Sequence, residues 1–242
     1  MHRSGSPFPV PRSPLLKPMP DILIADDHPL FREAMQRAVL AALPQASVHS
    51  ADSVHALLGL IEQFPDADLL LLDLHMPGAR GYSALAHIRG QYPGLPTIVV
   101  SGHEESLVAR RALAHGASAY IPKSTPGEAI VEAIRTVLDG DVWLPPSLLG
   151  GSTELRPDEA AAAARIATLT PQQFRVMTMI AEGLLNKQIA YDLGVSEATV
   201  KAHMTAIMRK LGVSNRTQVA LAASQLAVDH ETMPALPDDD ET

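Results

Sequence analysis

The strongest constraint on the fold is a fivefold alternation of short apolar segments with helix-length segments in the first part of the chain. The apolar segments, rich in leucine or β-branched residues, lie at 22–26, 47–50, 69–73, 97–101 and 119–122. The helix-length segments lie at 30–42, 53–63, 83–91, 105–115 and 126–139. Such alternation is typical of βαβ units, in which helices cover both faces of a parallel sheet. We therefore predict an α/β domain built on five parallel strands.

The remaining segments divide the chain further. A proline-rich arm at 1–19 lacks the apolar stretch of about 7–15 residues that a secretory signal needs. We place the α/β domain at 20–141 and a partly helical linker, containing Pro-Pro and Gly-Gly pairs, at 142–166. Residues 167–228 show only helical patterns and predict a small all-α domain. Residues 229–242 form a predicted acidic, disordered tail.

Charge is distributed unevenly. The net charge of −8, taken as a whole, argues against a nucleic-acid-binding protein. However, residues 21–146 hold 15 acidic and 8 basic residues, whereas residues 166–228 hold 3 acidic and 6 basic ones. The absence of cysteine excludes disulfides and thiolate chemistry, and no apolar run approaches the roughly 20 residues of a membrane helix. We expect a cytoplasmic protein without membrane contact.

Five residues with reactive or charged side chains lie at the carboxyl ends of the predicted strands. They close or directly follow the first, third, fourth and fifth strands and are Asp26, Asp27, Asp73, Ser101 and Lys123. The carboxyl ends of parallel strands meet at one edge of a sheet, where ligands bind in open α/β folds. Three carboxylates there attract a divalent cation such as Mg²⁺, and an aspartate beside the metal can attack a phosphoryl group. A hydroxyl and an ammonium group stabilise the transferred oxygens.

The aspartates among these residues could also have a purely structural role. Aspartates after strands commonly cap helices, and each aspartate alone fits that role better than a reactive one. The five side chains on four strand ends together favour a phosphoryl-transfer site.

The stretches ILIADDHPLFREAM, LLLLDLHMPG, VVSGHE and GASAYIPKS, in this order, resemble the receiver domain of two-component response regulators over about residues 20–140. The resemblance implies a flavodoxin-like sheet of order 2-1-3-4-5 and phosphorylation of Asp73 by a sensor histidine kinase. It also implies Mg²⁺ bound by Asp27, Asp73 and the backbone carbonyl of His75, with Asp26 acting through water. Ser101 takes the switch-hydroxyl position and Lys123 the catalytic-lysine position. Tyr120 takes the aromatic-switch position, although an ordinary strand tyrosine is the alternative.

Two departures from the receiver pattern are visible. Arg80-Gly81 stands where Asp-Gly is frequent, and histidines lie two residues after both Asp73 and Ser101. We hypothesise that these histidines, His75 and His103, tune the lifetime of an aspartyl phosphate. The alternative is that they are ordinary solvent-exposed loop residues.

The basic segment predicts four short helices with a helix-turn-helix in the middle. Thr170 caps the first, a turn at Gly194 follows the second, Ser196 caps the third, and Asn215 with Gln218 resembles a capping box for the fourth. At 100° per residue, the third helix carries one apolar face and a separate stripe of small, polar and basic residues: Ala198, Lys201, Ala202, Thr205 and Arg209. Such a stripe suits a major groove, although any amphipathic helix has a polar face.

Residues 169–226 resemble the LuxR-type helix-turn-helix, and the whole chain resembles a NarL/FixJ-type response regulator. The distinctive stretches are GLLNKQIAYDLGVSEATVKAH and RKLGVSNRTQ. The resemblance implies base contacts by Lys201, Ala202 and Thr205, phosphate contacts by Lys187, Ser196, Thr199 and Arg209, and dimerisation through the fourth helix at about 216–228. Leu185 departs from the pattern, because a serine cap is common there.

The sequence thus predicts a regulator that accepts a phosphoryl group on Asp73, dimerises and binds paired promoter half-sites. Its only catalysis would be its own phosphoryl transfer and dephosphorylation, and RNA polymerase is a further candidate partner. Three alternatives are a phosphorylation-independent DNA-binding protein, a receiver with an RNA- or protein-binding output, and a phosphohydrolase of the haloacid-dehalogenase type. The last is disfavoured because His75 stands where such enzymes carry a second acid.

Overall fold

The computed structural model describes residues 19–148 and 154–228. Three predicted segments therefore lie wholly or partly outside the described residues. They are the proline-rich arm up to residue 18, the part of the linker at 149–153 and the acidic tail at 229–242.

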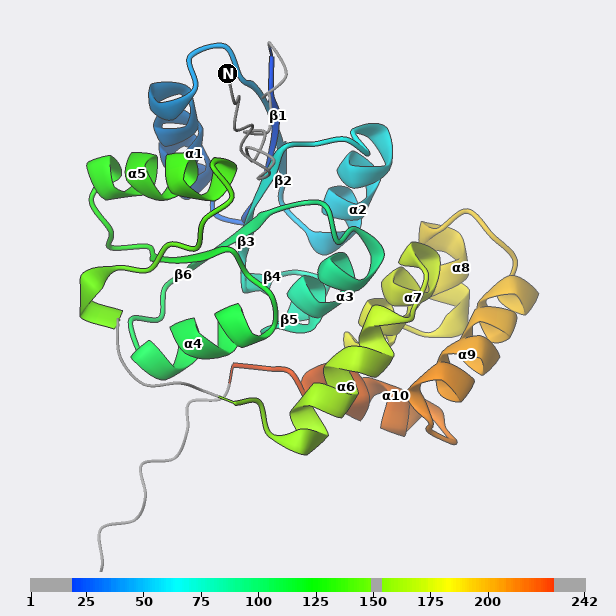
Figure 1. Cartoon of the computed structure of the whole chain (residues 1–242). Coiled ribbons are helices and arrows are strands. Elements are labelled where there is room, and N and C mark those ends of the chain that lie inside the picture. The colour runs from blue at the N-terminus through cyan, green and yellow to red at the C-terminus, as the bar shows by residue number, and fades with distance from the viewer. Residues whose placement is uncertain (1–18, 149–153, 229–242) are drawn as a thin grey trace, which may run out of the picture.

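Five parallel strands form the centre of the first domain (Figure 1). They are β1 (Asp21–Ala25), β2 (Ser47–Ala51), β3 (Leu69–Asp73), β6 (Thr97–Ser101) and β7 (Ala119–Pro122). The spatial order is β2-β1-β3-β6-β7, which confirms the predicted flavodoxin-like topology. The β3 strand is buried along its whole length, as expected for a strand covered on both faces.

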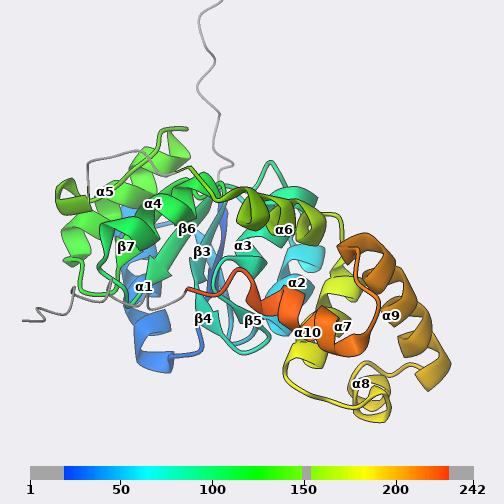
Figure 2. The same ribbon diagram turned by 90° about the horizontal axis from the view of Figure 1, so that it is seen from below.

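Alternate residues of the strands supply two separate apolar layers. Ile22, Ile24 and Leu71 pack in a cluster with α1 (Pro29–Ala42) and α5 (Gly127–Leu138). Leu70 and Leu72 pack on the opposite face, which is covered by α2 (Val54–Gln63), α3 (Ser83–Gln91) and α4 (Ser106–Ala114). Figures 1 and 2 show these helices on the two sides of the sheet. The period-2 alternation of the strands thus builds a three-layer domain.

A small antiparallel hairpin interrupts this pattern after β3. It consists of β4 (His75–Met76) and β5 (Ala79–Arg80), joined through Pro77 and Gly78, whose φ is +93°. Two-residue strands are too short to give a hydrophobic period, so the sequence did not predict this hairpin.

The second domain contains only helices in its described part, as predicted: α7 (Pro171–Ala181), α8 (Asn186–Asp192), α9 (Glu197–Leu211) and α10 (Arg216–Ser224). A short 3₁₀ helix (Pro146–Leu148) and α6 (Pro157–Ala167) precede it in the predicted linker. The caps at Thr170 and Ser196 are confirmed. The fourth predicted helix is shorter than expected. Its capping box is only half formed, since the Gln218 side chain accepts from the Ser214 backbone N–H rather than from that of Asn215.

The α6 helix occupies part of the predicted linker and packs against α3 of the first domain. The Gln91 side chain donates to the Ala167 carbonyl over 2.7 Å. Gly90 lies so close to Ala167 that a Cβ atom at position 90 would come within 2.8 Å of its carbonyl oxygen. The absence of a side chain at Gly90 therefore lets the two helices approach.

A buried histidine lies in the same interdomain contact. His87 of α3 is fully buried and stacks on Phe174 of α7, with ring centroids 4.1 Å apart and the rings almost parallel. Neither ring nitrogen forms a hydrogen bond with the described residues. Burial lowers the pKa of His87 to about 4, and the nearby Ile166 carbonyl offsets only part of this effect.

This burial predicts an acid sensitivity. The pKa of His87 is lower in the folded chain than its ordinary value of about 6.5, so the stability due to its neutral form is present above pH 6.5 and lost as the pH falls toward 4. Urea unfolding at pH 7 and pH 4.5 should show that His87→Phe loses about 2–3 kcal/mol less than the wild type, because phenylalanine does not titrate. Equal losses in the two proteins would contradict this assignment.

Candidate functional site

The register of the sheet brings the predicted reactive residues to one edge. Asp73 ends β3 opposite Val100 of β6, and Ser101 ends β6 opposite Pro122 of β7. Asp26 follows β1 directly, and Lys123 follows β7 directly. The Lys123 backbone N–H donates to the Ser101 carbonyl over 2.7 Å, which holds the last two positions together.

The ammonium of Lys123 links two buried carboxylates. Its Nζ atom lies 2.8 Å from Asp26 Oδ2 and 2.8 Å from Asp73 Oδ2, and it also lies 4.7 Å from the centre of the Phe31 ring. Burial acts to lower the pKa of Lys123, but the two carboxylates outweigh it and raise the pKa above its ordinary value. The lysine is therefore a permanent positive charge beside Asp73.

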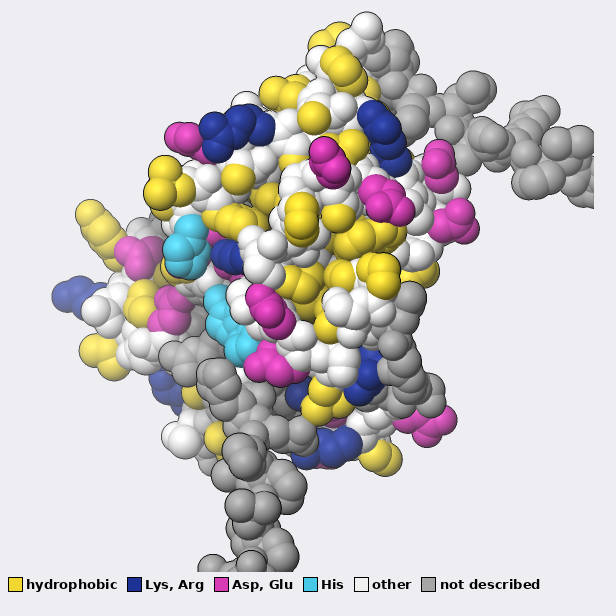
Figure 3. All heavy atoms as spheres, turned by 90° about the vertical axis from the view of Figure 1, so that its left-hand side faces the viewer, with side chains coloured by type: hydrophobic (Ala, Val, Ile, Leu, Met, Phe, Trp, Pro, Cys, Tyr) yellow, Lys and Arg dark blue, Asp and Glu magenta, His cyan; other side chains and the backbone are white. Residues whose placement is uncertain are grey.

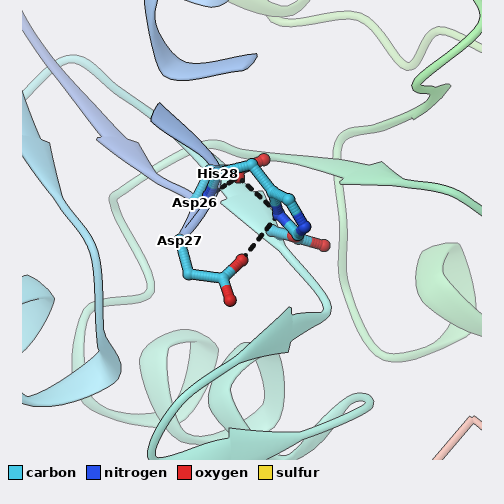
Figure 4. Close-up of side chains that lie close together, drawn as sticks. Asp26, Asp27 and His28 are labelled. Carbon is cyan, nitrogen blue, oxygen red and sulfur yellow. Dashed lines mark hydrogen bonds and ion pairs between the residues drawn. The ribbon is translucent and has the colours of Figure 1, made fainter. Parts of the chain in front are cut away.

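The residues around Asp73 fit a divalent metal. Ligand atoms from Asp26, Asp27, His28 and Asp73 all lie within 4.8 Å of one another. Asp27 Oδ1 is shielded from solvent and lies 2.7 Å from His28 Nδ1 (Figure 4), but it has no hydrogen bond of good geometry with the described residues. A buried carboxylate oxygen without a donor is suited to a hard cation such as Mg²⁺.

A cavity of about 620 Å³ opens above these carboxylates. Its lining includes Leu30, Phe31, Asp73, His75 and Lys123. The His75 backbone N–H donates to Asp73 Oδ1 over 3.0 Å, and its ring lies 5.0 Å from the ring of His103. Burial lowers the pKa of His75. Figure 3 shows histidine side chains beside acidic ones on one face of the molecule.

The two predicted switch residues are joined through one loop residue. Ser101 and Tyr120 are both fully buried. The Tyr120 hydroxyl donates to the His103 carbonyl over 2.8 Å, while the His103 backbone N–H lies 3.3 Å from Ser101 Oγ. Burial raises the pKa of Tyr120 to about 12, so its hydroxyl stays protonated as a donor. The structure thus brings Ser101 and Tyr120 to the same segment, 101–105, between β6 and α4.

The predicted DNA-reading residues lie on the second domain. Gly194 has a φ of +65° in the turn between α8 and α9, and Ser196 caps α9 by accepting from the Thr199 backbone N–H. One face of α9 is buried through Val200 and Ile207. The residues predicted to contact DNA lie outside this buried face. Of these residues, Thr199 is half-buried, and the others are exposed: Lys187, Ser196, Lys201, Ala202, Thr205 and Arg209.

Leu185 precedes α8 without a capping side chain. The Gln188 side chain compensates, because its Oε1 atom accepts from the Leu185 backbone N–H over 2.7 Å. The helix therefore begins at Asn186 although no side chain of residue 185 caps it.

Comparison with protein families agrees with both halves of this arrangement. Residues 22–135 match the response regulator receiver domain, and residues 167–223 match the bacterial regulatory proteins of the luxR family. The chain belongs to the NarL/FixJ-type response regulators. It is a transcription regulator with a receiver and a LuxR-type DNA-binding domain, rather than a metabolic enzyme.

Several relatives are similar over most of this response regulator. The glycerol metabolism activator of Pseudomonas putida is 39% identical over 85% of the chain and 95% of that protein. The nitrate/nitrite response regulator protein NarL of Escherichia coli K12 is 32% identical over 84% of the chain and 94% of that protein. A structure of two RcsB dimers bound to two parallel DNAs shares the fold, with a TM-score of 0.50, 23% identity, and coverage of 86% of this chain and 98% of that one.

Some contacts of this response regulator were not predicted from its sequence. The approach of His28 to the carboxylates and the interdomain ion pairs of Glu159 join residues whose separate positions give no periodic signal. The need for a glycine at position 81 could not be predicted either. Its φ is +60°, and the Leu226 carbonyl lies so close to it that a side chain would not fit, a contact that arises only when the two domains pack. None of the helices in the described part has the length and apolarity needed to cross a bilayer.

Proposed function

We propose that this chain is a cytoplasmic, phosphorylation-dependent transcription regulator whose Asp73 accepts a phosphoryl group from a sensor histidine kinase. The observation that carries the proposal is the buried Asp73 carboxylate, which faces the cavity and lies 2.8 Å from the ammonium of Lys123. In the transfer, an Asp73 oxygen forms a bond to phosphorus while the bond between phosphorus and the kinase's histidine nitrogen breaks. The product is an aspartyl phosphate.

Each of the other residues has a role in this step. Asp27, Asp73 and the carbonyl of His75 would hold Mg²⁺, and Asp26 would act through water; the metal would neutralise charge on the phosphoryl oxygens. Lys123 supplies a second positive charge, and Ser101 supplies a hydroxyl donor. The Tyr120 side chain would move together with that of Ser101, because both contact the backbone of His103.

The second domain would then bind promoter DNA as a dimer. Lys201, Ala202 and Thr205 would read base edges from the exposed face of α9, while Lys187, Ser196, Thr199 and Arg209 would contact phosphates. We assign dimerisation to α10, and we propose RNA polymerase as a further partner. The division into receiver, linker and DNA-binding domain at residues 141 and 166 is part of the same proposal.

The first prediction concerns the acceptor. Asp73→Asn should abolish the 80 Da mass increase that a small-molecule phosphodonor such as acetyl phosphate gives to the wild type, since an amide is not a nucleophile for phosphorus. Sedimentation and promoter footprinting should show that only the wild type gains dimer and occupancy with the donor. Unchanged dimerisation and occupancy in Asp73→Asn would favour the phosphorylation-independent alternative.

The second prediction concerns the paired histidines. His75 lines the cavity above Asp73, and its ring is in contact range of His103, so the two rings limit the approach of water to an aspartyl phosphate. The double variant His75→Ala/His103→Ala should lose its phosphoryl group several-fold faster when phosphate release is followed at pH 6, 7 and 8. Equal decay rates at all three values would refute the hypothesis.

The third prediction concerns DNA. Lys201→Ala should weaken binding to a specific site by about 1–3 kcal/mol, while Arg209→Ala should weaken binding to all sequences and reduce the salt slope by about 1. Fluorescence anisotropy of labelled duplexes over a range of salt concentrations measures both effects. Arg37→Ala, an exposed change on α1, is the matched control. Equal losses on specific and random duplexes for Lys201→Ala would exclude a base-reading role.

The small excess of basic residues in the second domain also limits its affinity for DNA. Residues 166–228 carry only three more basic than acidic residues, so one copy should bind weakly and with a shallow salt dependence. Tight binding of a monomer to one half-site at physiological salt would contradict this expectation.

A further inference from the structure

Two histidine rings meet at the mouth of the phosphorylation cavity, although they come from different loops. His75 lies in β4, shortly after β3, and His103 lies in the segment between β6 and α4. Their ring centres are 5.0 Å apart, and the ring planes are tilted by 42°. His75 lines the cavity, and Figure 3 shows histidine side chains next to one another at the surface, with acidic side chains beside them. We call His75 and His103 the histidine pair.

Hydrogen bonds to buried side chains hold the backbone of both histidines. The His75 N–H donates to the Oδ1 atom of the buried Asp73 over 3.0 Å. The His103 N–H donates to the buried Ser101 Oγ over 3.3 Å, and the His103 carbonyl accepts from the buried Tyr120 hydroxyl over 2.8 Å. Only the two side chains are left to adjust, so the pair is largely preorganised for a shared ligand.

The spacing of the rings suits one metal ion bound between them. A zinc–imidazole bond is about 2.0–2.1 Å long, so two imidazoles on one tetrahedral ion have ring centres about 5 Å apart. The observed distance of 5.0 Å agrees with this value. Imidazole is also the commonest metal ligand among side chains. Ordinary packing of two rings gives similar distances, so the neighbouring acid decides between the two interpretations.

Glu105 supplies a third ligand beside the pair. Its Oε2 atom lies 3.4 Å from His103 Nδ1, which is longer than a typical hydrogen bond. Two ligand atoms on one tetrahedral ion, each bound over about 2.1 Å, are roughly 3.4 Å apart. Glu105 is the N-cap residue of α4, but its side chain makes no capping hydrogen bond and is 59% exposed. Its carboxylate is therefore able to turn toward an ion held by the pair.

The local charge favours a further cation. Five carboxylates lie at this edge of the sheet: Asp26, Asp27, Asp73, Glu104 and Glu105. Two cationic side chains offset them, Lys123 and Arg32, each of which contacts Asp26. Five negative and two positive charges leave a local charge of −3, which exceeds what one Mg²⁺ ion neutralises.

We propose that His75, His103 and Glu105 bind a divalent transition-metal ion of the Zn²⁺ class at the mouth of the cavity. This site is separate from the Mg²⁺ site, because it uses two imidazole rings and Glu105 rather than the aspartates and the His75 carbonyl. Nitrogen ligands suit Zn²⁺, Co²⁺ and Ni²⁺, whereas oxygen ligands suit Mg²⁺. The fourth position of a tetrahedral ion is left for water.

A bound ion would also slow phosphorylation, a second step that rests on the function proposed above. The ion would tie the two rings together beside the cavity that opens above Asp73. The path of a phosphodonor to the Asp73 carboxylate would therefore become narrower. The chain would take up a phosphoryl group more slowly when Zn²⁺ is available.

The test measures Zn²⁺ binding to the untagged full chain by competition with a chromophoric chelator. Excess Mg²⁺ is present to occupy the aspartate cluster. His75→Gln/His103→Gln removes both rings and keeps the backbone. Loss of an indirect partner of a metal ligand costs about 10–100-fold in affinity, so loss of two ligands should weaken Zn²⁺ binding at least about 100-fold. The matched control is His55→Gln/His203→Gln, which removes two histidines of α2 and α9 and should bind Zn²⁺ as the wild type does.

A competing explanation places Zn²⁺ in the aspartate cluster, where His28 offers a nitrogen. His28→Gln separates the two, since it should leave the Zn²⁺ affinity nearly unchanged if the histidine pair binds the ion. Loss of Zn²⁺ binding in His28→Gln, or unchanged binding in His75→Gln/His103→Gln, would overturn the proposal. Glu105→Gln should weaken binding by about tenfold, and an unchanged affinity would overturn the assignment of Glu105 as a ligand.

Two further metals give readouts that do not depend on phosphorylation. Co²⁺ should give the wild type the strong visible absorption of a four-coordinate ion, and His75→Gln/His103→Gln should lack it. Mn²⁺ prefers oxygen ligands, so its binding to the aspartate cluster, followed by electron spin resonance, should be the same in the wild type and that double variant. Equal Mn²⁺ binding also shows that the strand ends of the variant are intact.

The two proposals fail separately. With acetyl phosphate and saturating Mg²⁺, buffered Zn²⁺ should slow the mass gain of the wild type several-fold and leave the rate of His75→Gln/His103→Gln unchanged. If neither protein gains mass, the function proposed above fails, while the metal site is still supported by its binding data. If Zn²⁺ binds the wild type without changing its rate of phosphorylation, the second step is wrong.

Discussion

The arrangement of the whole receiver depends on the register of parallel strands that end at one edge of the sheet. Asp73 pairs with Val100 and Ser101 pairs with Pro122, so the residues at and after these strand ends converge. A shift of one residue would turn each side chain to the opposite face of the sheet. The buried layers on both faces oppose such a shift, and the stability of the core therefore maintains the geometry of the site.

The same convergence creates an electrostatic conflict that Lys123 relieves. Asp26 and Asp73 are both buried, and each lies 2.8 Å from the lysine ammonium. A metal ion and a phosphoryl group would change this balance in opposite directions, because one adds positive and the other negative charge. Local charge at the strand ends is therefore a natural input for a conformational change in segment 101–105 and α4.

The sequence was sufficient for the sheet and for the grouping of Asp26, Asp73, Ser101 and Lys123, because these follow from periodicity and from residues next to strand ends. The order of the strands followed from the resemblance to receiver domains. It was sufficient for the caps at Thr170 and Ser196, which depend on local hydrogen bonds. It did not reveal the packing of α6 on α3 or the burial of Glu159. Those features depend on side chains from separate domains that meet only after both have folded, and an alanine-rich stretch looks the same whether it packs or stays in solvent.

The position of the interdomain contact decides what kind of control this fold can exert. If the receiver covered α9, its release would raise the affinity for any DNA, including a single half-site. Here the reading face of α9 is already exposed, so a separation of the two domains would add little to the affinity for a single half-site. Since one small basic domain binds DNA weakly, affinity gained through assembly on two half-sites exceeds what unmasking one domain would supply.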